Sequence, residues 1–143
     1  MPDRRPAPIP RPERRIVVTD AFRQWAGGLS AEIRADLAAA IERIAETGPT
    51  LGRPAVDRIH GSRVHKLKVA RLPDGVRALF AFDSRQNVVM LTGGNKTGQW
   101  NRWYPAKIQQ AERLYADHER TMGKEAAWRN ARGIGRSSSD LGP

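Results

Sequence analysis

The alternation of apolar and polar residues predicts a short strand and then a short helix at the start of the folded part of the chain. Residues 16–19 read Ile-Val-Val-Thr, a β-branched run that is too short for a helix and favours an extended strand. Asp20 is placed to cap a helix that carries Phe22 and Trp25, and Gly27-Gly28 interrupts that helix.

A second helix is predicted from Ser30, as its cap, to Thr47. Its apolar residues recur at spacings of three and four, which places them on one face, whereas most of its charges fall elsewhere. These apolar residues are Ile33, Leu37, Ile41 and Ile44. The two helices, separated by Gly27-Gly28, form a helical hairpin. A loop containing Gly52, Pro54 and Gly61 follows it.

Three strand-like runs come next, at residues 64–72, 76–82 and 88–92. Asp74-Gly75 is a strong hairpin signal, because glycine accepts the positive φ that a tight turn requires. Residues 83–87 supply a second, longer polar turn. The three runs therefore predict an antiparallel meander.

The last predicted element is a helix with Pro105 as its first residue, reaching about Arg120. Gly93-Gly94 is expected to end the third strand and to open a loop before this helix. The apolar side of the helix consists of Ile108, Ala111, Leu114 and Tyr115. The order of elements indicates an α+β domain whose helices pack on one face of a small sheet.

Composition divides the chain into three parts: a basic arm at 1–14 with five prolines, a domain at 15–120, and a basic tail at 121–143. The 143 residues include 25 Lys and Arg against 15 Asp and Glu, for a formal charge of +10 and a pI near 11.1. This balance favours a polyanionic partner, nucleic acid above all, over mere solubility. The sequence contains no cysteine, signal peptide or membrane span, so a cytoplasmic location is expected.

The basic residues concentrate in the centre of the domain. Seven of them lie between Arg53 and Arg77, against two acids. In a regular strand Lys66 and Lys68 point to one face, above an apolar layer of Leu67 and Val69. Arg77 alternates with Leu79 and Ala81, and we expect it to approach the two lysines across the hairpin.

A second group of cations follows the third strand, interleaved with aromatic residues. It consists of Lys96, Arg102 and Lys107 together with Trp100, Trp103 and Tyr104. Single-stranded RNA is held by cations on its phosphates and by planar groups stacked on its bases, which this mixture provides. The alternative for each tryptophan is that it seals the edge of the core.

Several other chemistries are disfavoured. Gly93-Gly94-Asn95-Lys96-Thr97 lacks the spaced leading glycine of a phosphate-binding loop, which argues against a nucleoside triphosphatase. The three histidines, His60, His65 and His118, do not have metal-ligand spacing, and no metal or cofactor is predicted. No Ser/His/Asp pattern or pair of carboxylates stands out, so nuclease chemistry would use basic side chains.

Three segments together resemble the RelE/ParE superfamily of toxins, nearest to its phage-type HigB-like members. They are HKLKVAR (65–71), DGVRALFAFD (74–83) and VVMLTGGNKTGQWNRWY (88–104), and the resemblance covers about residues 15–120. It implies a ribosome-dependent, cofactor-free mRNA interferase, silenced by a cognate antitoxin of the helix-turn-helix type. It also implies that the catalytic residues are Lys66, Lys68, Arg77 and Tyr104.

In that chemistry a ribose 2′-OH attacks the neighbouring phosphorus, and clustered cations stabilise the charge that develops. One of the two lysines, with its pKa lowered by the other, would act as the general base. Arg77 would clamp the phosphate, and Tyr104 would orient a nucleobase of the RNA. The set is thus expected to converge on one phosphate. Further RNA contacts are predicted at Arg63, His65, Arg71, Lys96, Trp100, Arg102, Trp103 and Lys107.

The sequence leaves two alternatives open. A ParE-like member of the same fold would poison DNA gyrase by protein contact and would not need the four predicted catalytic residues together. A non-catalytic nucleic-acid-binding module would use the basic residues for electrostatic affinity only.

Overall fold

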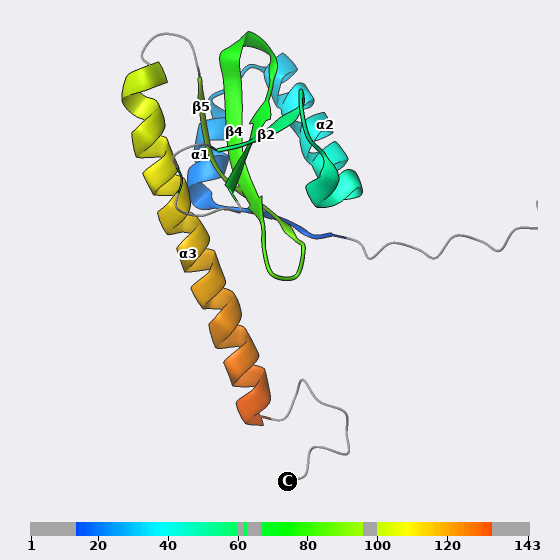
Figure 1. Ribbon diagram of the computed structural model, residues 1–143, viewed down its shortest axis with the longest axis vertical. Helices are drawn as coiled ribbons and strands as arrows, with labels where there is room; N and C mark the ends of the chain where they lie inside the picture. The colour runs from blue at the N-terminus through cyan, green and yellow to red at the C-terminus, as the bar shows by residue number, and fades with distance from the viewer. Residues whose placement is uncertain (1–13, 60–61, 63–66, 96–99, 133–143) are drawn as a thin grey trace, which may run out of the picture.

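The computed structural model of the chain describes residues 14–59, 62, 67–95 and 100–132 (Figure 1). The elements within these residues follow in the order β1 (Ile16–Val18), α1 (Asp20–Gly27), α2 (Ala31–Thr47), β2 (Val56–Arg58), β3 (Leu67–Arg71), β4 (Val76–Phe82), β5 (Val88–Asn95) and α3 (Trp100–Arg132), with short 3₁₀ turns at Gly48–Thr50 and Pro73–Gly75. The predicted α+β class is confirmed.

The strands form one sheet in the order β1-β5-β4-β3-β2. Strands β3, β4 and β5 are the expected antiparallel meander, and its third strand runs on to Asn95 instead of ending at Thr92. Two features were not expected: β1 pairs in parallel with β5, and part of the expected loop forms β2, which pairs with β3. Strand β2 has only three residues, too few for an alternation to be visible in the sequence.

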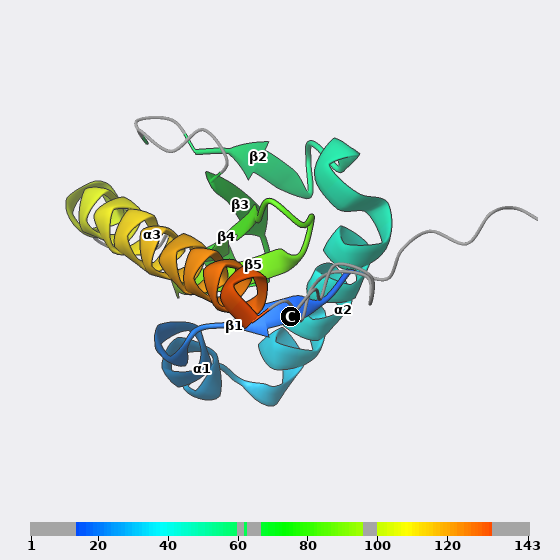
Figure 2. The ribbon, with the colours of Figure 1, turned by 90° about the horizontal axis from the view of Figure 1, so that it is seen from below.

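The helices cover both faces of the sheet, so the expectation that they share one face was wrong. Figure 2 shows the sheet between α2 and α3. The face of α1 and α2 buries Phe22, Leu37, Ile44, Val56, Ala70, Leu72, Val76, Ala78, Phe80, Phe82, Val88 and Met90. The face of α3 buries Ile59, Leu67, Val69, Leu79, Ala81, Val89, Leu91, Ile108, Ala111 and Tyr115. Both sets of alternate positions in the meander are apolar, and a strand that is apolar on both sides has to be covered twice.

Side-chain hydroxyls cap the first two helices. Thr19, and not the expected Asp20, caps α1: its hydroxyl accepts from the Phe22 N–H at 3.0 Å and donates to the Leu91 carbonyl at 2.6 Å. Asp20 is instead the first helical residue, where a carboxylate suits the helix dipole. Ser30 caps α2 as expected, at 3.2 Å from the Ile33 N–H.

Helix α3 begins earlier and ends later than expected. It includes Pro105, which was expected to be its first residue, and continues to Arg132 instead of ending near Arg120. Pro105 lies close to the start of the helix, where it removes only one backbone hydrogen bond. The second half of α3 extends beyond the sheet (Figure 1, orange). Among the described residues no helix is long and apolar enough to cross a membrane.

Arg14, the expected last residue of the arm, is fixed to the domain. Its Nη1 donates to the Ala45 carbonyl at 2.9 Å, in the last turn of α2, where a cation complements the helix dipole. Its guanidinium also lies against Gly48, 2.5 Å from where a β-carbon would be, and the φ of Gly48, +79°, is one that residues with a side chain rarely adopt. Residues 1–13 lie outside the described part of the chain.

Candidate functional site

Two arginines stand side by side at the hairpin end of the central strands. Arg71 on β3 is directly opposite Arg77 on β4. Both alternate with residues whose side chains are buried under α3: Val69 in β3 and Leu79 in β4. Because alternate residues of a strand share a face, both guanidiniums belong to the α3 face of the sheet. The hairpin and the start of α3 lie at the same end of the molecule (Figure 1).

Arg77 is half-buried and held by its own hairpin. Its Nη1 donates to the Leu72 carbonyl at 3.1 Å and to the Val76 carbonyl at 2.8 Å. Burial lowers the pKa of Arg77, and the nearby charge of Arg71 lowers it further. An arginine remains protonated at neutral pH even so, and Arg77 is a fixed positive charge.

Asp57, on the neighbouring strand β2, binds the other member of the pair. Its Oδ2 lies 3.7 Å from Nη2 of Arg71 and accepts from Nε of Arg53 at 3.1 Å. Its Oδ1 accepts from the Arg58 backbone N–H at 2.8 Å. The hydrogen bonds from Arg53 and from the Arg58 backbone lower the pKa of Asp57, so this carboxylate is ionised at neutral pH.

Tyr104, in the first part of α3, completes the group. Its pKa is raised, because burial disfavours the phenolate and the charge of Asp57 disfavours it further, while Arg71 and Arg77 act in the opposite direction. Tyr104 packs against the core on the α3 face of the sheet, which is also the face of Arg71 and Arg77, and its raised pKa keeps the phenol protonated at neutral pH. We call Arg53, Asp57, Arg71, Arg77 and Tyr104 the cationic site.

Lys68 lies on the opposite face of the sheet, so the expectation that it converges with Arg77 on one phosphate was wrong. Its Nζ donates to the Pro49 carbonyl at 3.1 Å and lies 5.8 Å from the centre of the Phe82 ring, on the side of α2. The reason is the register: Lys68 pairs with Phe80, and Arg77 is an odd number of residues from Phe80. An apolar layer was predicted beneath the lysines, on the other face of the strand; the side of Lys68 has an apolar layer as well, which includes Ala70, Phe80 and Phe82.

The structure places few of the other predicted site residues. Lys107 is half-buried on α3, one turn after Tyr104. Arg63, His65, Lys66 and Lys96 lie outside the described residues. Trp100, Arg102 and Trp103 are in the first turn of α3, but their side chains are not among those described. The roles predicted for these residues stay predictions.

Sequence reasoning missed Asp57 and Arg53 as members of the site. The signal that could have found them is the spacing Arg53-x-x-x-Asp57 beside a basic strand. It becomes informative only once β2 is known to pair with β3, because Asp57 then lies opposite Val69, on the same face as Arg71.

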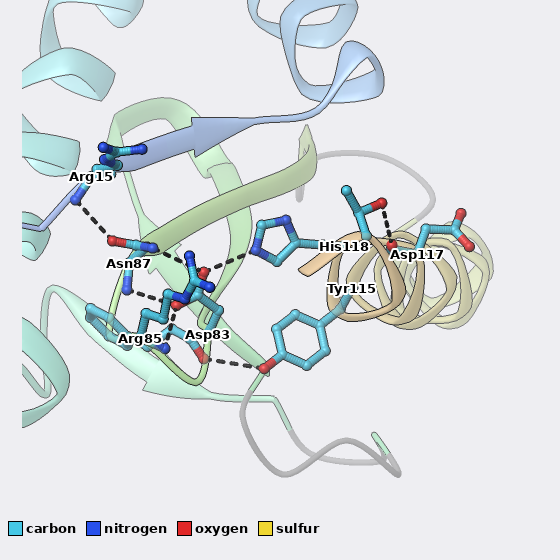
Figure 3. Close-up of polar contacts among 9 residues, drawn as sticks. Arg15, Asp83, Arg85, Asn87, Tyr115, Asp117 and His118 are labelled. Atoms are coloured by element: carbon cyan, nitrogen blue, oxygen red, sulfur yellow. Dashed lines mark hydrogen bonds and ion pairs between the residues drawn. The ribbon is translucent and has the colours of Figure 1, made fainter. Parts of the chain in front are cut away.

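A second polar cluster lies at the β4–β5 turn (Figure 3). Asp83 is 2% exposed, and its carboxylate accepts from the backbone N–H groups of Arg85 and Asn87, from the Asn87 amide and from His118 Nε2 at 2.9 Å. Burial acts to raise the pKa of Asp83, but the hydrogen bonds from His118 and the turn outweigh it, and the pKa is lowered. Tyr115 donates to the Phe82 carbonyl at 3.3 Å. This cluster fastens α3 to the turn.

The chemistry of the cationic site is that of anion recognition. Two neighbouring guanidiniums offer planar donors that suit a phosphate, and the phenol offers an O–H donor and a stacking surface. Among the described residues no group of three or more His, Cys, Asp or Glu side chains is arranged to hold a metal ion.

The fold and site define a small, basic α+β protein with the cationic site of arginines and a tyrosine on the α3 face of its sheet. The chain belongs to the family of phage-derived Gp49-like proteins (DUF891), whose model matches residues 24–116. The resemblance stated from the three sequence segments is thereby confirmed at the level of the family.

Two relatives in Mycobacterium tuberculosis are named as candidate toxins. HigB2 is 43% identical over 98 residues, which are 66% of this chain and 49% of the relative. HigB3 is 37% identical over 99 residues, which are 68% of this chain and 86% of the relative. The aligned part of the chain thus spans about half the length of one relative and most of the other. The RelB–RelE antitoxin–toxin complex of Methanococcus jannaschii has a similar chain, with 10% identity, a TM-score of 0.49, and coverage of 61% of this chain and 98% of that one.

Proposed function

We propose that this protein is the toxin of a toxin–antitoxin pair and that it cleaves mRNA on the ribosome without a metal ion. The observation that carries the proposal is the pairing of Arg71 with Arg77 beside the protonated phenol of Tyr104. The names of the HigB2 and HigB3 relatives support the class of toxin. A cognate antitoxin, the ribosome and mRNA are the proposed partners, and the cytoplasm is the proposed location.

In this proposal the two arginines bind the phosphate whose bond is broken. Attack by the adjacent 2′-OH places additional negative charge on the phosphoryl oxygens, and fixed guanidiniums stabilise that charge without having to reorganise. Tyr104 donates a hydrogen bond or stacks on a base, which holds the 2′-OH in line with the bond that breaks. Both contributions require positive charge and a protonated phenol. The raised pKa of Tyr104 supports the protonated phenol, and Arg77 stays protonated at neutral pH even though burial and Arg71 lower its pKa.

The general base is proposed from residues outside the described part of the chain. Lys68 is on the wrong face, and arginines do not deprotonate at physiological pH. Lys66 and His65, which precede β3, remain the candidates. The catalytic set proposed for this chain is therefore Arg77 and Tyr104 with either Lys66 or His65 as the base, with Arg71 added as a phosphate ligand and Lys68 removed.

Mapping mRNA ends after incubation with translating ribosomes tests the proposal. Arg77→Ala is expected to slow cleavage by about 10²-fold, the loss typical for removing one preorganised donor of transition-state charge. Tyr104→Phe removes only a hydroxyl and is expected to slow it less. Arg34→Ala, an exposed arginine of α2 on the other side of the sheet, is the matched control and should cleave normally.

Lys68→Met separates the revised site from the one expected from sequence. Its ammonium serves the α2 face, so the variant should retain cleavage within a few-fold once melting temperatures show that it is folded. In-codon cuts that vanish in Arg77→Ala and persist in Lys68→Met support the proposal. Intact mRNA with broken DNA would favour the gyrase-poisoning alternative, and salt-sensitive RNA binding without any cleavage would favour the binding module.

A further inference from the structure

Asp57 is an acid in a site whose proposed ligand is an anion. A carboxylate there repels phosphate, and evolution of a pure phosphate site would favour its absence. Its side chain is nevertheless only 14% exposed, with both oxygens engaged. The carboxylate is thus a fixed part of the site and not a solvated surface charge.

The arrangement of the two arginines explains what such an acid does. Directly opposite residues on antiparallel strands have their β-carbons about 5 Å apart, and like charges in that position repel. Arg77 cannot move away, because two hairpin carbonyls hold its guanidinium. Arg71 is half-exposed at the end of β3 and would be free to turn toward solvent unless something held it.

Asp57 is the group that holds it. Strand β2 places Asp57 opposite Val69, two residues before Arg71 on the same face, and the carboxylate reaches the Arg71 guanidinium at 3.7 Å. Arg53 donates to the same oxygen, Oδ2, and the Arg58 backbone N–H donates to Oδ1, so both oxygens of the carboxylate are held in place. Arg53 thus contacts Asp57, Asp57 contacts Arg71, and Arg71 lies opposite Arg77.

We propose that Asp57 is a positioning residue, whose carboxylate holds the Arg71 guanidinium beside Arg77 so that both cations face one phosphate. This inference rests on the proposed function, in which the phosphate is that of RNA. Asp57 does not touch the RNA in this arrangement; it acts through Arg71. It also balances the positive charge around Tyr104, which helps to keep the phenol protonated.

The first experiment separates positioning from simple repulsion. Asp57→Asn and Asp36→Asn each raise the net charge by one, and Asp36 is exposed on α2, away from the cationic site. Single-turnover cleavage on programmed ribosomes, measured over a range of protein excess, gives a maximal rate and a half-saturating concentration. For Asp57→Asn we expect the maximal rate to fall about 10-fold relative to Asp36→Asn, with no rise in the half-saturating concentration.

Asp57→Glu tests the same point by rescue, because it retains the charge and should recover part of the lost rate. A maximal rate for Asp57→Asn equal to that of Asp36→Asn would overturn the proposal. A rate above it would also overturn it, because the carboxylate would then be only a competitor of the phosphate.

The second experiment does not depend on cleavage. The chain has two tyrosines, so a spectroscopic phenolate titration reports Tyr104 with Tyr115 as an internal reference. Burial and Glu119 raise the pKa of Tyr115 to about 12, and Asp57 is not among its causes. Asp57→Asn should lower the pKa of Tyr104 and leave that of Tyr115 unchanged; Tyr104→Phe assigns the two transitions.

The two experiments fail independently of each other. A wild-type protein that leaves ribosomal mRNA intact refutes the proposed function, and the tyrosine titration then decides whether Asp57 controls the charge of the site. A maximal rate for Asp57→Asn equal to that of Asp36→Asn overturns the inference even if the wild-type protein cleaves mRNA, and an unchanged Tyr104 titration would show that the Asp57 carboxylate does not act on the phenol.

Discussion

Replacing Asp83 by asparagine should cost a large part of the stability of this domain. The Asp83 carboxylate accepts four hydrogen bonds: two from backbone N–H groups at Oδ1, both at 2.9 Å, and two at Oδ2 from the Asn87 amide and from His118. The introduced amide retains one oxygen, which can keep the two backbone bonds. Its NH₂ group then faces two donors, so the bonds at Oδ2 are lost or reversed.

The magnitude follows from the bonds at Oδ2. A hydrogen bond to a charged group contributes about 1.5–3 kcal/mol, and His118 can recover part of that by accepting from the amide in its other tautomer. The Asn87 bond is long, at 3.3 Å, and adds little. We expect Asp83→Asn to lower the free energy of unfolding by about 2 kcal/mol and Asp83→Ala, which removes all four bonds, by about 3–5 kcal/mol.

Urea unfolding followed by circular dichroism measures this loss. With a slope of about 1–1.5 kcal/mol/M for a domain of this size, Asp83→Asn should lower the midpoint by about 1–2 M. The matched control is Asp117→Asn, which makes the same chemical change on the outer side of α3, where Asp117 is 61% exposed and pairs with Arg120. It should cost less than about 0.5 kcal/mol. Equal midpoints for the two variants would refute the reasoning.

Two further perturbations test the packing and the electrostatics of the same framework. Gly93→Ala places a β-carbon 2.4 Å from the Trp25 ring, which also contacts Phe22, so it should lower the free energy of unfolding in urea by about 1–3 kcal/mol. Gly27→Ala, with open space around it, is the control and should lower it little. Equal stability of the two variants would contradict this packing. The lowered pKa of Asp83 means that its contribution is present above its unfolded pKa, near 3.8, and is lost as pH falls through the lower folded pKa. The stability of Asp83→Asn should therefore depend less on pH in the acid range than that of the wild type, and identical slopes would exclude this role.

Local signals were sufficient for most of the elements. The Ser30 cap, the periodicity of α2 and the Asp74-Gly75 turn each depend on residues close together in sequence, and all three are present. Asp74 and Gly75 both have positive φ, at 60° and 75°, as this turn requires. The helix α3 was misplaced because Pro105 is compatible with the first turn and, less often, with a position further in.

Long-range pairing was not predictable in the same way. The parallel contact between β1 and β5 joins residues about 70 apart, and nothing in the three residues of β1 specifies a partner. The short β2 has the same difficulty. Because Asp57 enters the cationic site only through β2, the failure to predict this strand hid one member of the site.

The Lys68 error has a more general cause. Alternation was assigned correctly for both strands, with Leu67 and Val69 on one face of β3 and Leu79 and Ala81 on one face of β4. The sequence alone does not tell which face of β3 lies on the same side of the sheet as a given face of β4. That relation depends on the register through the hairpin, and a shift of one residue exchanges every side chain between faces.

Burial on both sides of the sheet then restricts where a cation can be. In the middle of β3 and β4 each face is covered by a helix, so an ammonium there has to find an acceptor at the rim, as Lys68 does at the Pro49 carbonyl. At the end of the sheet that carries the β3–β4 hairpin, α3 only begins to cover the strands. Arg71 and Arg77 can therefore keep their charges near water while the rest of their strands is in the core. Tyr104 lies where the start of α3 reaches this end of the sheet. The position of the cationic site thus follows from the two-sided core: a basic pair on adjacent central strands is tolerated only beside the turn, and there the first part of α3 supplies the phenol.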